Sequence, residues 1–489
     1  MTRQMRRLVW VVVALAGLLG SVQAQQVVAP DAGADNLGWR LGMQAYTFNQ
    51  QTFFEAVDQN KELGLKVIEA FPGQKLSKDG DVKVDVNMPA DAKKKMLDKL
   101  KEADVKLVNF GVTGADSPEA WRKLFEFAKE MGIETIVSEP AEKDFDLLDK
   151  LVEEFQINIA IHNHPKPSPY WSPESVLKVI QGRSKRIGAC ADTGHFRRSG
   201  LDPLESLKKL EGHIISLHFK DLDQDEKAKE AEDREWHDTP WGTGQSDAWA
   251  LLGELKRQNF RGTFAIEYEY HWNKAMPELA KCVQYFNLVT SALDASSFIE
   301  PTEQDFAAHT IQDEGGWEFK DGVLESKGKG DVWSRDKFGD FVFDLEFKCA
   351  ENTNSGVFLR CASIEDWLNT AIEVQIAQQK QSKPAEDCGG LFDVQAPAKN
   401  LVKKAGEWNH YTILAKGSQI VVVLNGTQVV NADLDKWTEA GKNPDGAKNK
   451  FKYAYKDMAR VGHLGLQYHG TPISFRNLKV KALSEIQGN

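Results

Sequence analysis

Short apolar runs alternate with amphipathic segments from Trp39 to residue 290, and this pattern constrains the fold of that part of the chain most strongly. Between the runs, segments such as PEAWRKLFEFAKEMG carry apolar residues at helical spacing, and several begin with Ser, Asp or Pro caps. Eight βα units in about 250 residues match the size of a closed (β/α)8 TIM barrel. An open doubly wound sheet is the alternative, but no run is followed by GxGxxG, so a dinucleotide-binding crevice is not supported. The eight runs read LGMQAYTF, LKVIEAF, KLVNFG, IETIVSE, INIAIHNH, RIGACAD, IISLHFK and GTFAIEYE.

Side chains able to bind a cation lie at the carboxyl ends of the last five runs. In a parallel α/β barrel all of these ends open on one face, where the chemistry is built. Each residue alone is more often a helix cap or a satisfied core residue, but several on neighbouring strands favour a site. Glu269 is the weakest candidate, since it can sit past the rim in solvent. The residues are Glu139, His162, His164, Asp192, His218, Glu267 and Glu269.

We expect four of these side chains to hold one divalent cation. A mixed set of carboxylate oxygens and an imidazole nitrogen suits Mn, Co, Mg or Zn. Proton transfer at a carbon α to a carbonyl needs a base within hydrogen-bond reach and a Lewis acid that stabilises the enediolate. A metal between two carboxylates supplies both, and the same apparatus can isomerise a ketose, epimerise it, or add water across an enolisable double bond. The four predicted ligands are Glu139, Asp192, His218 and Glu267.

Residues 39–290 also resemble the xylose-isomerase-like barrel family of sugar phosphate isomerases and epimerases. The matching pieces are LGMQAYTF, SEP, IHNH, DTGH, HFKD, PWGTGQSDAW and IEYE. The resemblance implies the same four metal ligands, two of which, the glutamates, also move protons beside the sugar carbonyl. It implies substrate-side positions for His195 and Lys220. His162 and His164 depart from some members, so their role stays open between substrate contact and support of the metal ligands.

The periodicity changes after Ser291, where SALDASSFIEPTEQD loses helical character and predicts a linker over residues 291–304. Runs such as FVFDLEFK, AIEVQIA and GHLGLQYH then alternate on a two-residue repeat between Gly, Asn and Pro turns. Residues 305–484 therefore predict an all-β, antiparallel jelly-roll sandwich.

The same alternation predicts which side chains of the sandwich share a face. Polar groups opposite Val, Leu and Ile cannot be buried in a dry core without partners, so they favour a concave groove suited to a sugar. An ordinary solvent-facing sheet surface is the alternative. The pairs expected to point together are Phe358 with Arg360, Glu373 with Gln375, and Gln467 with His469.

This part of the chain resembles the 3-keto-disaccharide hydrolase family, which has a concanavalin-like sandwich. GWEFKDGVLES, NSGVFLR, IEVQI, GGLFDVQAP, LNGTQVV and GHLGLQYHG occur in the family order. The resemblance implies a glycoside oxidised to a ketone at C3, whose acidified C2 hydrogen is removed so that the C1 oxygen leaves by β-elimination. We expect Glu373 or His469 as the base and Arg360 facing the enolate charge. Gln375 and Gln467 are expected to bind substrate.

Together the two parts predict a bifunctional enzyme. Elimination in the sandwich would release a 3-keto-2-hydroxyglucal, and the metal-dependent barrel would hydrate it to 3-ketoglucose. The alternative is a sugar isomerase or epimerase barrel that carries a non-catalytic carbohydrate-binding sandwich. Because no nicotinamide-binding signal is present, a separate oxidoreductase is expected to oxidise C3 upstream.

The first 24 residues predict a cleavable signal peptide, followed by a linker over residues 25–38. Three arginines precede an apolar run over residues 8–20, and Val22 and Ala24 fit the small-residue rule for cleavage. The run is too short to span a bilayer, which takes about 20 residues. The chain is therefore expected in the periplasm or outside the cell, and a pair of adjacent arginines permits the twin-arginine route.

Charge and cysteine content exclude several classes of partner. A net charge of −11 disfavours nucleic acid and anionic lipid. Five cysteines without a CxxC pair indicate neither a zinc ribbon nor a dense disulfide framework. Cys349 and Cys361 could pair across adjacent strands, but buried free thiols are the favoured reading.

Overall fold

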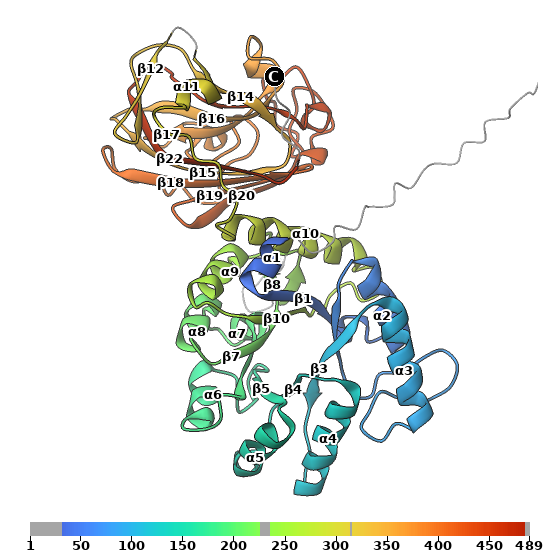
Figure 1. Cartoon of the computed structure of the whole chain (residues 1–489). Coiled ribbons are helices and arrows are strands. Elements are labelled where there is room, and N and C mark those ends of the chain that lie inside the picture. The colour runs from blue at the N-terminus through green and yellow to red at the C-terminus, as the bar shows by residue number, and fades with distance from the viewer. Residues whose placement is uncertain (1–31, 225–234, 313–314, 485–489) are drawn as a thin grey trace, which may run out of the picture.

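The computed structural model describes residues 32–224, 235–312 and 315–484. The predicted signal peptide lies outside these residues. The described chain forms a closed parallel barrel followed by two antiparallel sheets, so the predicted α/β barrel and β-sandwich are both confirmed (Figure 1). No helix within these ranges has the length and apolar character needed to span a membrane.

Eight parallel strands close the barrel in the order β1-β10-β7-β6-β5-β4-β3-β2. All of their carboxyl ends therefore open on one face. The barrel strands are β1 (Trp39–Gln44), β2 (Val67–Ala70), β3 (Lys106–Thr113), β4 (Thr135–Ser138), β5 (Asn158–His162), β6 (Ile187–Asp192), β7 (Ile214–Phe219) and β10 (Gly262–Ile266). A two-stranded hairpin, β8 (Asp221–Gln224) and β9 (Trp236–Thr239), follows β7.

Helices surround the barrel, and their first turns show why they begin where they do. Thr52 and Glu55 form a capping box, while Ser117 and Ser172 accept hydrogen bonds from backbone N–H groups and precede a proline. The helices are α1 (Ala32–Leu37), α2 (Phe53–Glu62), α3 (Ala90–Ala103), α4 (Pro118–Met131), α5 (Phe145–Phe155), α6 (Pro173–Ile180), α7 (Thr193–Arg198), α8 (Pro203–Lys209), α9 (Ala248–Arg257) and α10 (Met276–Leu293). Thus the segment expected to be an N-terminal linker includes α1, and α10 takes up the first three residues of the expected second linker, 291–293.

The sandwich has a five-stranded sheet, β11-β14-β21-β16-β17, and a seven-stranded sheet, β12-β13-β22-β15-β18-β19-β20. Strand alternation sends one set of side chains from each sheet into a shared apolar core. The strands are β11 (Thr310–Gln312), β12 (Trp317–Lys320), β13 (Val323–Ser326), β14 (Val332–Phe338), β15 (Phe341–Cys349), β16 (Asn354–Cys361), β17 (Ile372–Ala377), β18 (Trp408–Lys416), β19 (Gln419–Leu424), β20 (Thr427–Asp433), β21 (Gly462–Leu466) and β22 (Ile473–Ala482). Two short helices are α11 (Phe306–His309) and α12 (Trp367–Thr370). All five cysteines are free, so the alternative pairing of Cys349 with Cys361 is wrong.

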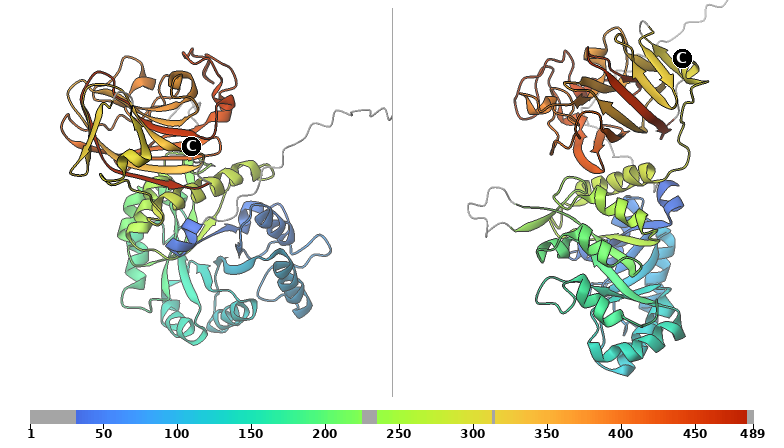
Figure 2. Two further views of the ribbon diagram at one scale, coloured as in Figure 1. Left: turned by 45° about the horizontal axis from the view of Figure 1, so that its top comes forward. Right: turned by 90° about the vertical axis from the view of Figure 1, so that its left-hand side faces the viewer.

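The outer face of the seven-stranded sheet packs on the flank of the barrel. Four apolar side chains on that face join the barrel's own core cluster, and Figures 1 and 2 show the sandwich seated on α10. Tyr285 and the carbonyl of Gly242 hydrogen-bond to Gln428 at 2.7 Å each, and Lys481 pairs with Asp294 at 2.9 Å. The four apolar side chains are Val342, Leu414, Val421 and Val423.

Candidate functional sites in the barrel and the sandwich

The barrel strands deliver a buried group of polar side chains to the open face. His162, Asp192 and His218 are within the last residues of β5, β6 and β7, and Glu267 directly follows β10. Asp192 also caps α7, because its Oδ1 accepts the backbone N–H of His195 at 2.8 Å. That hydrogen bond leaves Asp192 Oδ2 to face the centre of the barrel mouth.

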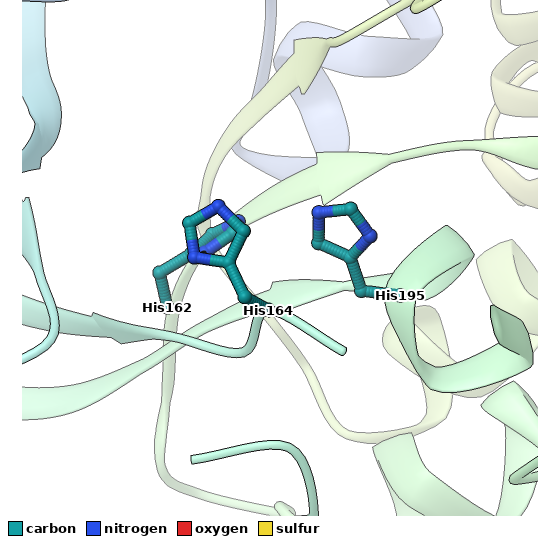
Figure 3. A group of neighbouring side chains, drawn as sticks. All are labelled: His162, His164 and His195. Atoms are coloured by element: carbon teal, nitrogen blue, oxygen red, sulfur yellow. The ribbon is translucent and has the colours of Figure 1, made fainter. Parts of the chain in front are cut away.

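Four of these side chains bring possible ligand atoms within 4.8 Å of one another. They combine two imidazoles with two carboxylates, and all four residues are buried. His164 forms a second, more exposed set with His162 and His195, and Figure 3 shows the His195 ring across from the other two rings. The four residues are His162, Asp192, His195 and Glu267.

Glu139 lies at the outer end of this group. Its Oε1 is 2.6 Å from His164 Nδ1 and 3.5 Å from His162 Nδ1, and Ser168 donates to its Oε2 at 2.9 Å. His162 Nε2 is in turn 3.6 Å from Asp192 Oδ2. In this structure His162 therefore stands between Glu139 and Asp192, whereas Asp192 and Glu267 belong to the same four-residue group.

Lys220 occupies the middle of the buried carboxylates. Its Nζ lies 2.9 Å from Asp192 Oδ2, 2.8 Å from Glu267 Oε2 and 2.8 Å from Glu269 Oε2. Lys220 is fully buried, so this ammonium ion is a fixed structural charge. Glu269 does not simply sit in solvent beyond the rim, as one interpretation of the sequence allowed, because it also pairs with Arg198 at 2.7 Å.

The protonation state of each residue in the cluster depends on its burial and on the charged side chains beside it. Burial by itself would raise the pKa of Asp192, but His195 and Lys220 hold that pKa well below its usual range. Burial would also raise the pKa of Glu267, but Lys220 and His218 hold that pKa well below its usual value. Burial lowers the pKa of His195 well below its usual value. At neutral pH the cluster therefore offers charged carboxylates beside the neutral imidazole of His195. Burial also disfavours charge on His162 and His218, but neighbouring acidic groups raise the pKa of both.

The residues present fit a divalent cation. Two buried imidazole nitrogens near the cluster, His162 Nε2 and His218 Nδ1, make no hydrogen bond within the described parts of the chain, whereas Asp192 Oδ2 is paired with Lys220 at 2.9 Å. Buried nitrogen and oxygen lone pairs without donors are costly unless something else satisfies them. Imidazole with carboxylate is a donor set that Mn, Co and Zn accept.

Several contributing residues were missed by the sequence interpretation. Glu69 in β2 is buried beneath the cluster, and Asp238 on β9 pairs with Arg198 at 3.1 Å above it. Burial raises the pKa of Asp238 to about 7, although Lys220 and Arg198 oppose the rise. Glu69 interrupts an otherwise apolar strand run, VIEA, and this was the one sequence signal that could have identified it.

The outer face of the five-stranded sheet carries the second candidate site. Glu373 faces away from the sandwich core, opposite Phe358 in the neighbouring strand, and its carboxyl lies directly over Gly356, where a Cβ would meet Oε1 at 2.4 Å. Burial raises the pKa of Glu373 to about 8, with Lys450 opposing the rise and Asp331 adding to it. No hydrogen bond to this carboxyl occurs among the described residues. Glu373 is thus a buried acid or base that opens on this face.

The other predicted groove residues line the same face, with one exception. Gln375 Nε2 donates to Asn354 Oδ1 at 3.0 Å, and Asn354 Nδ2 is 3.3 Å from the ring of the exposed His469. Gln467 follows β21 and bonds through its backbone N–H to Gly356. These residues and Glu373 form what we call the outer-sheet site.

Arg360 is the exception, and the prediction that it points together with Phe358 is wrong. The register of β16 shifts between Phe358 and Cys361, and Arg360 has a φ of +52°. This bulge turns the guanidinium to the carbonyls of Gly339 and Gly417, each at 2.7 Å, and to Asp340 at 3.1 Å. Arg360 therefore ties the two sheets together at one end of the sandwich.

Two family profiles match the chain. Residues 57–286 match a xylose isomerase-like TIM barrel, and residues 303–481 match a 3-keto-alpha-glucoside-1,2-lyase-like domain. Each profile covers one of the two domains. Its domains are those of a carbohydrate-active enzyme that acts on a small carbohydrate.

Three relatives give the extent of the similarity. A 3-keto-disaccharide hydrolase of Bacteroides thetaiotaomicron is 23% identical, and the match covers 34% of this chain and 70% of the relative. The rhizopine catabolism protein MocC of Rhizobium meliloti is 27% identical, with 31% of this chain and 48% of the relative covered. An uncharacterised protein of Parabacteroides distasonis with a crystal structure is 33% identical at a TM-score of 0.42, and the match covers 51% of this chain and 98% of that one.

Proposed function

We propose that this chain degrades 3-keto-glucosides in two steps, with β-elimination in the sandwich and hydration of the resulting 3-keto-2-hydroxyglucal in the barrel. The observation that carries the proposal is the pairing of two different proton-transfer sites in one chain. Glu373 is a buried carboxyl with a raised pKa, while the barrel holds charged carboxylates beside two buried imidazole nitrogens that make no hydrogen bond among the described residues. The first site is suited to removing one acidified hydrogen, and the second is suited to stabilising an enediolate.

In the sandwich step, deprotonated Glu373 removes the C2 hydrogen that the C3 ketone has acidified. The electron pair forms the enolate, then the C1–C2 double bond as the C1–O bond breaks. The proton taken from C2 returns to the leaving oxygen, so the step consumes no acid or base overall. We assign the binding of sugar hydroxyls to His469 and Gln375, which both contact Asn354. The charge of Lys450 lowers the pKa of Glu373. We therefore assign to Lys450 the role first expected of Arg360, that of the cation facing the enolate charge.

In the barrel step, water adds at C1 of the unsaturated ketone and a proton is delivered to C2. A bound divalent ion would polarise the ketone. Its candidate ligands are His162, Asp192, His195, His218 and Glu267. The contacts run in series from Glu139 through His162, Asp192 and Lys220 to Glu267, so the two glutamates stand at opposite ends of the cluster. One glutamate would take a proton from the attacking water, and the other would deliver a proton to C2, as the family resemblance implies.

The layering of the chain supports transfer of the intermediate through solvent. From the barrel outward the order is α10, the seven-stranded sheet, the apolar core, and the five-stranded sheet with the outer-sheet site. Glu373 therefore faces away from the barrel. A separate oxidoreductase would supply the 3-keto substrate, and a periplasmic or extracellular location remains our expectation.

The test is incubation of the full chain with a 3-keto-glucoside and Mn²⁺ in D2O, followed by NMR. Elimination followed by hydration places deuterium at C2 of the 3-ketoglucose formed in the first turnovers. The change Asp192→Asn is expected to accumulate the glucal, visible by its enone absorbance. Product that keeps the C2 hydrogen, or a sandwich that holds glycan without releasing an aglycone, would overturn the proposal. The latter outcome would favour a carbohydrate-binding sandwich beside an isomerase barrel.

A further inference from the structure

His218 lies between two carboxylates in the interior of the barrel. Its Nε2 is 2.9 Å from Glu69 Oε1, and its Nδ1 is 3.1 Å from Glu267 Oε2. The two contacts differ in kind: the first is a hydrogen bond, whereas Nδ1 makes none within the described chain. Both His218 and Glu69 are buried, so water does not compete for either nitrogen.

Glu69 is fixed from two sides by neighbouring strands. Gln44 of β1 donates through Nε2 to Glu69 Oε1 at 2.8 Å, and Asn109 of β3 donates through Nδ2 to Glu69 Oε2 at 3.0 Å. Gln44 is itself held, because the same Nε2 donates to the carbonyl of Gly111 and its Oε1 accepts the N–H of Tyr46. With two amide donors already in place, both carboxylate oxygens of Glu69 act as acceptors.

An acceptor at Nε2 determines which nitrogen of a neutral imidazole carries the proton. Glu69 Oε1 accepts from Nε2–H, so when His218 becomes neutral, as metal binding requires, its lone pair is on Nδ1. Nδ1 points toward Glu267 Oε2, which shares the Lys220 ammonium with Asp192 Oδ2. A carboxylate on the far nitrogen also makes the facing nitrogen a stronger donor to a metal.

We propose that Glu69 is a positioning residue that keeps the His218 proton on Nε2 and thereby presents the Nδ1 lone pair to a divalent cation in the barrel. This inference rests on the proposed cation site of the barrel and is independent of the sandwich step. Glu69 does not itself contact the cation. Its contribution passes through the orientation and basicity of one imidazole.

The test compares Mn²⁺ and Co²⁺ affinity, measured by calorimetry on the full chain, for two variants. Glu69→Ala removes the acceptor and is expected to weaken the affinity by about 10–100-fold. Glu69→Gln keeps an acceptor oxygen for Nε2–H but loses the negative charge, so its loss is expected to be smaller. Glu254→Gln, on α9 and paired with Arg257 instead, is the matched control and should bind as the wild type does. Affinity unchanged in both Glu69 variants would overturn the proposal.

A measurement on the unmodified chain covers the case in which these variants fail to fold. In protein labelled with ¹⁵N-histidine and loaded with Zn²⁺, His218 is expected to show a proton on Nε2 and none on Nδ1. A proton on Nδ1 would overturn the proposal. If the wild type binds no divalent cation while His218 still carries its proton on Nε2, the cation site fails and the tautomer assignment stands.

Discussion

Lys220 Nζ lies 2.8 Å from Glu267 Oε2 in the mouth of the barrel. The same ammonium contacts Asp192 at 2.9 Å, so a side-chain cation already neutralises two carboxylates that would serve a divalent ion. Buried carboxylates need such a partner, because isolated charges are expensive away from water. Lys220 therefore keeps the site folded and charged before any ion binds.

Removing this ammonium should destabilise the barrel. Lys220→Met leaves two buried carboxylates unpaired, and loss of one partner from a buried pair costs about 3–5 kcal/mol. We expect a lower Tm in EDTA and partial recovery with Mn²⁺, measured by thermal unfolding. Lys209→Met, which removes an exposed pair with Glu174 at 2.6 Å, should cost at most about 1 kcal/mol. A similar Tm loss in both variants would contradict this account of Lys220.

The elimination step should depend on pH through Glu373. Because a base must first lose its proton and burial raises this pKa to about 8, aglycone release should rise with pH and level off above that value. Below the plateau the increase should approach about tenfold per pH unit. Stopped assays across this range would measure it, with the exposed Glu318→Gln as control. A profile that is flat on both sides of the predicted pKa would count against Glu373 as the base, as would retained release by Glu373→Gln.

Arg360 should affect stability and leave chemistry unchanged. Arg360→Met removes hydrogen bonds to two carbonyls and an ion pair with Asp340, for an expected loss of about 1.5–3 kcal/mol. Urea unfolding would measure the loss. At a temperature where the variant remains folded, kcat for aglycone release should equal that of the wild type. A fall in kcat without a fall in stability would return Arg360 to the active site.

The two sites should work in separate molecules. If the glucal travels through solvent, a mixture of Glu373→Gln and Asp192→Asn chains should convert 3-keto-glucoside to 3-ketoglucose, although neither variant does so alone. NMR of the mixture would follow both the glucal and the final product. Failure of the mixture, with each variant retaining its other activity, would mean that the intermediate passes directly within one chain.

The sequence alone determined the fold class and the strands that carry each site. Apolar residues at spacings of two and of about 3.6 reveal which side of a strand or helix is buried, and that information is local. It also placed Glu139, Asp192, His218 and Glu267 at barrel strand ends and Glu373 on a polar sheet face. Periodicity does not predict which of those side chains contact one another, because such contacts depend on barrel closure and on the direction of each side chain.

Only the tertiary structure decided those contacts. Closure of the barrel brings Glu69 against His218, from a strand whose polar residue looked like an interruption of an apolar run. It also places Lys220 among the carboxylates and His162 between Glu139 and Asp192. A one-residue register shift in β16 turned Arg360 away from the face that alternation predicted. Periodicity records which side faces the core, whereas bulges and pairing across the barrel fix which atoms touch.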